Sequence, residues 1–112
     1  MAIFEPWDVV AVPFPYTDKA TRQRRPALVV AAGSLQADHG LLWVLMITSA
    51  ENRGWPGDVV ITDLPQAGLP VASVIRTAKI ATIETKEAER IGSVGPDVRG
   101  TVEALVSRRL FA

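Results

Sequence analysis

The sequence contains no cysteine and only one histidine, His39, among its 112 residues. The absence of cysteine excludes disulfides and thiolate metal sites, and it is compatible with a reducing cytosol. The sequence also contains no His-x-x-x-His pair and no paired Asp/Glu cluster, so we expect neither a bound metal nor a cofactor.

Long apolar runs and an excess of one charge are also missing. No apolar run reaches the roughly 18–20 residues that span a bilayer, and the first ten residues lack the pattern of a secretory signal. Twelve basic residues balance twelve acidic ones, which excludes a protein that coats nucleic acid with its whole surface but leaves a local basic cleft open. We expect a cytoplasmic protein without a membrane partner.

What is present indicates one folded domain over residues 1–112. The apolar fraction is 48% and the charged fraction is 21%, far from the composition of a disordered chain. A chain of this length buries only about two-thirds of its unfolded surface. Self-association would therefore add useful burial.

Short Val- and Ile-rich runs, broken by Gly, Pro and Asp, predict strands. With no helical pattern between them, they indicate an antiparallel all-β core, which we expect to form a small curled β-barrel. The predicted strands are Asp8–Pro13, Ala27–Ala32, Leu41–Thr48, Asp58–Thr62, Ser73–Thr77, Lys79–Ile83 and about Arg90–Val94.

The C-terminal segment predicts one helix that closes the barrel. Asp97, after Pro96, is the expected N-cap. Gly100 weakens this helix by about 1 kcal/mol relative to alanine. Five apolar residues fall on one helical face: Val98, Val102, Leu105, Val106 and Leu110.

A basic run, "KATRQRRPALVV", precedes the second predicted strand. Lys19, Arg22, Arg24 and Arg25 lie within seven positions on the loop between the first two strands, and Pro26 biases Arg25 toward extended backbone. An arginine held in this way presents a guanidinium fork that matches phosphate oxygens. The alternative is a solvated basic loop that keeps the rim of the barrel soluble.

A second candidate is the stretch "VLMITSAENRGW". Thr48 and Ser49 end an apolar strand, and their hydroxyls could donate to a phosphoryl oxygen or cap their own turn. Arg53 and Trp55 follow in the next loop, where Trp55 could stack a base or pack at an interface. Arg76, in "SVIRTAKI", is either a groove residue or half of a surface ion pair.

The remaining motifs carry less. His39 lies in the turn "ADHG", and a ribonuclease with separate histidine base and acid cannot be built from one histidine within one chain. Glu84, Glu87 and Glu89 are typical of a solvated turn. No Gly-rich phosphate loop and no Gly-x-Ser-x-Gly elbow is present.

The order and spacing of four segments resemble the MazF/PemK family of toxin endoribonucleases. They are "WDVVAVPFPYTD", "RRPALVV", "MITS" and "GLPVASVIRTAKIATIE", and the resemblance covers about Pro6 to Gly95. It implies an SH3-like β-barrel, a homodimer, and metal-independent, sequence-selective cleavage of single-stranded RNA to 2′,3′-cyclic phosphate and 5′-hydroxyl ends. Such toxins inhibit translation and growth, and a cognate antitoxin neutralises them through a disordered, often acidic segment.

The resemblance also implies roles for single residues. The family's catalytic arginine precedes the proline that opens the second strand, which carries over to Arg25; its catalytic threonine carries over to Thr48. RNA-binding residues are expected among Lys19, Arg22, Arg24, Ser49, Arg53 and Arg76. The doubled arginine is a departure, so Arg24 could share the role of Arg25. The variable first loop carries no information on RNA specificity, and the sequence identifies no general base.

Two alternatives remain open from the sequence. A CcdB-like toxin that inhibits gyrase uses the same barrel without the Arg25–Thr48 pair. An SH3-like interaction module, or an inactive homologue, would leave RNA intact.

Overall fold

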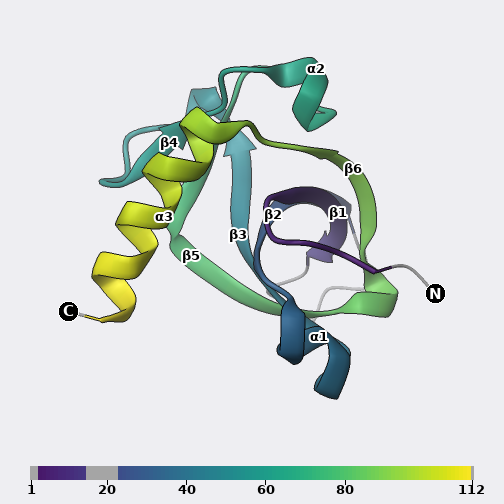
Figure 1. The fold of residues 1–112 in the computed structure, drawn as a ribbon. Coiled ribbons are helices and arrows are strands. Elements are labelled where there is room, and N and C mark those ends of the chain that lie inside the picture. Colours follow the sequence, from purple (N-terminus) through teal and green to yellow (C-terminus); the bar gives the residue numbers. More distant parts are fainter. Residues whose placement is uncertain (1–2, 15–22, 112) are drawn as a thin grey trace.

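The computed structural model describes residues 3–14 and 23–111, and its core is one curled antiparallel sheet (Figure 1). The strands follow the order β4-β5-β3-β2-β1-β6, so β4 and β6 form the two edges. Within the described residues the edges do not pair with each other, and the sheet is curled but not closed. The strands are β1 Asp8–Phe14, β2 Gln23–Ala31, β3 Leu41–Ser49, β4 Asp58–Val60, β5 Ser73–Glu84 and β6 Glu89–Ser93.

The predicted mainly β fold with a C-terminal helix is confirmed. In the part of the chain that the structure describes, three helices accompany the sheet: α1 Gly33–His39, α2 Leu64–Ala67 and α3 Pro96–Leu110. Two 3-10 turns, η1 Ala50–Asn52 and η2 Thr85–Glu87, follow β3 and β5. The expectation of no helix between strands was wrong, because α1 and α2 are too short to show a helical period in sequence.

Side chains alternate between the two faces of each strand, and each face of the sheet contributes to its own apolar core. In β3, Leu45 and Ile47 pack toward α2 and α3 together with Val98 and Val102. Met46, between them, packs into the other core, inside the curl. The second core also contains Phe4, Val10, Val12, Ala27, Val29, Ala32, Leu42 and Val44.

The predicted strands Ser73–Thr77 and Lys79–Ile83 form one continuous strand, β5. β5 runs through Ala78 without a break, whereas the sequence predicted separate strands on either side of it. The register on β3 changes from Leu45↔Ile80 to Met46↔Arg76, so three extra residues of β5 bulge out at this point. Such an irregularity bends a strand without ending it.

The second strand begins earlier than predicted. β2 starts at Gln23, so Arg24 and Arg25 lie within a strand and pair with Pro13 and Val12 of β1. The prediction that Arg24 lies on the loop was wrong, whereas the prediction that Pro26 keeps Arg25 in extended backbone at the strand is confirmed. Lys19 and Arg22 lie outside the described residues.

The C-terminal helix packs as predicted through its first turns. Val98 and Val102 are buried, whereas Leu110 is 53% exposed beyond the core. The N-cap is Gly95 rather than Asp97, because Pro96 already occupies the first helical position. Asp97 instead accepts a hydrogen bond from the Thr62 hydroxyl at 2.8 Å.

The contact between β6 and α2 gives a stability prediction. A Cβ on Gly92 would overlap the backbone of Ala67, whereas a Cβ on Gly100 in α3 meets no atom within 4 Å. We expect Gly92→Ala to lower the free energy of unfolding by about 1–3 kcal/mol through overpacking. Gly100→Ala is the matched control and should raise it by about 0.5–1 kcal/mol.

Urea denaturation of the two variants and the wild type measures this difference. A Gly92→Ala variant as stable as the Gly100→Ala variant would contradict the close packing of β6 on α2.

Candidate functional site

The pairing of β2 with β3 bears on how the two candidate catalytic residues, Arg25 and Thr48, lie relative to each other. The ladder ends at Ala27↔Met46 although both strands continue, and Pro26 beside its end has no N–H to donate. If the register continued for two more residues, Arg25 would lie opposite Thr48, but the two strands do not pair there. Arg25 shares a face with Ala27, and Thr48 with Met46, because side chains repeat every two residues. Both therefore lie on the face of the inner core, beyond the last paired residues.

The Thr48 hydroxyl lies at the entrance of the η1 turn. Its Oγ1 accepts a hydrogen bond from the side-chain amide of Asn52 at 3.0 Å. Since that bond uses a lone pair of the oxygen, the hydroxyl proton is left to donate elsewhere. Ser49 caps η1, with its Oγ accepting from the backbone N–H of Glu51 at 3.3 Å. The capping role considered for these hydroxyls thus applies to Ser49.

A buried ion pair holds the loop that follows η1. The Arg76 guanidinium on β5 donates to both carboxylate oxygens of Asp58 on β4, at 3.2 and 3.0 Å, and to the backbone carbonyl of Asn52 at 2.6 Å. The side chains of Arg76 and Asp58 are only 11% and 8% exposed. Asp58 also accepts from the backbone N–H groups of Gly54 and Trp55, both at 3.3 Å.

These contacts set the charge of Asp58. Burial alone raises its pKa, but the hydrogen bond from Arg76, the Trp55 N–H, the Arg76 charge and the Gly54 N–H outweigh it and lower the pKa below the usual 3.8. The carboxylate is therefore ionised at neutral pH and keeps the loop in place. Because the pKa of Asp58 is lower in the folded chain than in the unfolded one, the ionised carboxylate stabilises the fold above pH 3.8. This stabilisation is lost as the pH falls from about 3.8 through the lower pKa of the folded chain.

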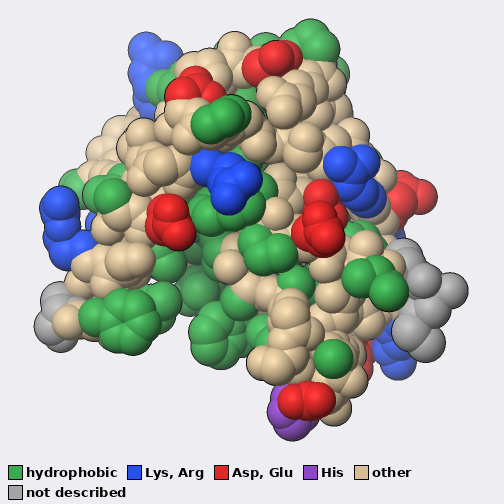
Figure 2. Space-filling view, viewed as in Figure 1, with side chains coloured by type: hydrophobic (Ala, Val, Ile, Leu, Met, Phe, Trp, Pro, Cys, Tyr) green, Lys and Arg blue, Asp and Glu red, His purple; other side chains and the backbone are tan. Residues whose placement is uncertain are grey.

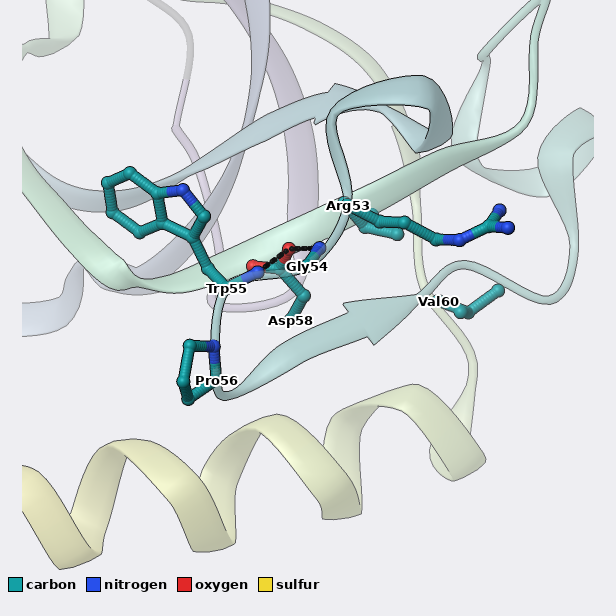
Figure 3. Close-up of a pocket in the computed structure, with 7 residues that line it drawn as sticks. Arg53, Gly54, Trp55, Pro56, Asp58 and Val60 are labelled. Atoms are coloured by element: carbon teal, nitrogen blue, oxygen red, sulfur yellow. Dashed lines mark hydrogen bonds between the residues drawn. The ribbon is translucent and has the colours of Figure 1, made fainter.

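A cavity of about 460 Å³ opens between this loop and the β4–β5 pair (Figure 3). Val74 pairs with Thr48 on one side and with Val60 on the other, so the cavity continues along the face that carries Thr48. In Figure 3, Arg53 and Trp55 extend from the loop in opposite directions. The lining residues are Arg53, Gly54, Trp55, Pro56, Asp58, Val60 and Val74.

Trp55 is a half-exposed aromatic on the rim of this cavity. It is 45% exposed, and the Arg76 guanidinium carbon lies 4.3 Å from its ring centroid. The Lys79 ammonium lies 5.5 Å from the same centroid. Both contacts are within the range of cation–π attraction. Two cations of the protein thus already contact the ring.

The other predicted residues take different positions. Arg24 donates to the backbone carbonyls of Ala11 and Glu87, at 2.9 and 3.4 Å, on the face opposite Arg25. Arg25 is exposed and donates to the Gln23 side chain at 3.4 Å. Arg53 is exposed on the cavity rim. Arg76, which the sequence left as a groove residue or a surface ion pair, forms a buried pair.

Sequence reasoning missed the roles of Asn52 and Asp58. In the sequence, Asp58 shows only as the first residue of a predicted strand, and Asn52, the single asparagine of the chain, only as a loop residue. The pairing of Asp58 with Arg76 follows from the β4–β5 register, which no local pattern reveals.

The described residues offer neither a metal centre nor a membrane-spanning helix. This part of the chain contains no group of three or more His, Cys, Asp or Glu side chains able to hold a metal ion. None of its helices combines the length and apolar character required to cross a membrane.

The buried ion pair gives a second stability prediction. Arg76→Leu leaves Asp58 charged and unpaired, so we expect a loss of about 3–5 kcal/mol in the free energy of unfolding. Arg76→Lys keeps the positive charge but loses the two-pronged contact. Its free energy of unfolding should therefore lie between those of Arg76→Leu and the wild type.

The matched control is Lys86→Ala, which removes the exposed pair of Lys86 with Glu84, 3.7 Å apart. It should cost less than about 1 kcal/mol. Urea denaturation measures all four proteins, and equal losses for Arg76→Leu and Lys86→Ala would contradict the role of the ion pair.

The comparisons with known proteins agree with this fold. Residues 5–110 match the family described as "PemK-like, MazF-like toxin of type II toxin-antitoxin system". No curated protein matches the chain. The structure is similar to MazF (Form-I) from Deinococcus radiodurans, with a TM-score of 0.79, 20% identity and 100% of each chain covered.

Two complexes are also similar. MazE-MazF (Form-II) from Deinococcus radiodurans gives a TM-score of 0.77 at 20% identity, covering 99% of this chain and 98% of that one. An endoribonuclease in complex with its cognate antitoxin from Mycobacterial species gives 0.74 at 15% identity, covering 98% and 95%. At such identities the likeness establishes the fold. The family match, which covers nearly the whole chain, confirms the resemblance seen in the sequence: the chain belongs to the PemK-like, MazF-like toxins of type II toxin–antitoxin systems.

Proposed function

We propose that this toxin is a metal-independent endoribonuclease that cleaves single-stranded RNA, with Arg25 and Thr48 acting at the scissile phosphate. The observation that supports the proposal is the β2–β3 register, because its continuation past Ala27↔Met46 would set these two residues opposite each other on the face of Val74, which lines the cavity. Cleavage of messenger RNA by such an activity would inhibit translation and growth.

The reaction is an internal transfer of the phosphodiester. The 2′-oxygen forms a bond to phosphorus and loses its proton, while the bond from phosphorus to the 5′-oxygen breaks and that oxygen gains a proton. The products are a 2′,3′-cyclic phosphate and a 5′-hydroxyl. Between the substrate and these products lies a pentavalent phosphorane, which carries more negative charge on its non-bridging oxygens than the substrate does.

Arg25 suits the stabilisation of that charge. Its guanidinium carries a positive charge and offers several N–H donors in a fixed plane. Thr48 adds one neutral donor to the same oxygens. Its Oγ1 accepts the hydrogen bond from Asn52, so its hydroxyl proton is left to donate to the phosphate. A donor placed for the transition state lowers the barrier by up to roughly 3–4 kcal/mol, and a charged donor contributes more than a neutral one.

The RNA on either side of the scissile phosphate would follow the cavity. Arg53 on its rim supplies a cation for a neighbouring phosphate, and the exposed face of Trp55 supplies a stacking surface for a base. The other predicted RNA-binding residues are proposed to hold the RNA strand or to shape the groove that it follows. They are Lys19, Arg22, Arg24, Ser49 and Arg76. Of these, Arg24, Ser49 and Arg76 already make contacts within the chain.

The expected partners are a cognate antitoxin and a second copy of the chain. A disordered acidic segment of the antitoxin would meet Arg25 and Arg53 in the same groove. An exposed apolar surface favours self-association: Figure 2 shows hydrophobic side chains gathered beside the C-terminal end of α3. Trp43 of β3 and Ile80 of β5, which are 40% and 48% exposed, line a second cavity. Covering them would supply burial that a chain this short lacks.

Incubation of the purified chain with a long RNA in the presence of a chelator tests the activity. Discrete fragments with 5′-hydroxyl ends support the nuclease. Intact RNA together with stalled gyrase would instead support the CcdB-like alternative, and intact RNA without growth arrest would support an interaction module.

Replacing the charged residue of the pair tests its role. We expect Arg25→Ala to lower the cleavage rate by at least about a hundredfold, because the phosphorane loses its cation. Arg108→Ala, in the last turn of α3, removes a matched arginine from outside the site and should leave the rate unchanged. Single-turnover cleavage measures both variants, and near-normal cleavage by Arg25→Ala would overturn the assignment.

The neutral donor should matter less than the cation. Thr48→Val preserves the shape of the side chain and removes its hydroxyl, so we expect a loss of roughly ten- to a hundredfold in the same assay. A loss larger than that of Arg25→Ala would mean that the hydroxyl, and not the guanidinium, is the main stabiliser of the phosphorane.

A further inference from the structure

The turn after β3 holds the Thr48 hydroxyl in one orientation. Asn52 lies four residues after Thr48, at the end of η1, and its Nδ2 donates to Thr48 Oγ1 at 3.0 Å. A threonine hydroxyl at a strand end otherwise rotates among staggered positions. While the amide donates to the oxygen, the hydroxyl proton is directed away from Asn52.

The backbone of Asn52 is fixed from the other side. Its carbonyl accepts from Arg76 Nη2 at 2.6 Å, and Asp58 holds that guanidinium in a two-pronged contact. The chain of contacts therefore runs from a buried ion pair, through one asparagine, to the hydroxyl at the rim. The start of η1 is fixed as well, since Ser49 accepts from the Glu51 N–H.

The position of this bond argues against a mainly structural purpose. Asn52 is exposed and Thr48 is only half-buried. A neutral hydrogen bond in such a place adds little net stability, because water replaces it when it is lost. Its main effect is on the direction of the Thr48 hydroxyl.

We infer that Asn52 is a positioning residue for Thr48, which it orients so that the hydroxyl proton points at the non-bridging oxygens of the scissile phosphate. The inference rests on the proposed function, because it assigns a task within that reaction. Asn52 acts through Thr48 and need not touch the RNA.

This role predicts a specific kinetic pattern. Asn52→Ala should lower kcat by roughly five- to tenfold with little change in KM, because orientation matters only when charge develops on the phosphate. Asn52→Asp, of nearly the same shape, should lower kcat at least as much. Its carboxylate accepts hydrogen bonds and would draw the Thr48 proton away from the substrate.

A double-mutant cycle separates positioning from a contact with RNA. In the Thr48→Val background the hydroxyl is absent, so adding Asn52→Ala should cause no further loss of kcat. Gln36→Ala is the matched control: Gln36, on α1, is another side-chain amide that makes hydrogen bonds, here with the backbone of Phe4 at 2.8 and 2.9 Å, and it lies outside the site. It should keep the wild-type kcat.

The experiment measures kcat and KM of the full chain on an RNA whose cleavage site has been mapped, with circular dichroism to verify folding. If Asn52→Ala lowers kcat equally in both backgrounds, or changes only KM, the inference fails while the proposed function stands. If the wild type leaves RNA intact, the proposed function fails first and the inference with it.

Discussion

The pairing of β2 with β3 is the constraint on which both the core and the site depend. Side chains alternate with a period of two, so a slip of one residue would turn Ala27 and Val29 out of the inner core. The same slip would move Arg25 to the face opposite Thr48. The apolar contacts that stabilise the fold thus also determine which face of its strand carries Arg25 and which carries Thr48. Hydrophobic packing is not directional, but by fixing the strand register it determines which face of the sheet each polar side chain takes.

The loop beyond β3 shows a different use of polar groups. Replacing a buried ion pair by apolar residues of similar volume is often neutral or stabilising, so the Arg76–Asp58 pair is weak evidence for stability by itself. What it supplies is geometry: two N–H groups of the loop, the Asn52 carbonyl and the Trp55 ring all meet this pair. Breaking either half would release several contacts at once.

The sequence predicts the strands well and the contacts between them poorly. Val- and Ile-rich runs locate all six strands within a few residues, and a Pro-preceded helix is visible at the C-terminus. The early start of β2 is hidden because Gln23, Arg24 and Arg25 are polar, and only pairing with β1 makes them strand residues. The continuity of β5 is hidden by its bulge. Arg25 and Thr48 were named from a resemblance, while Asp58 and Asn52 depend on register and on a turn, which no local pattern encodes.

The half-exposed Trp55 gives the site an optical probe. Indole emission responds to nearby charge and to solvent, and this ring lies against Arg76 and lines the cavity. Trp7 and Trp43 lie elsewhere, on the segment before β1 and within β3. A chain that keeps Trp55 as its single tryptophan would therefore report occupancy of the groove by its own fluorescence, without a label and without turnover.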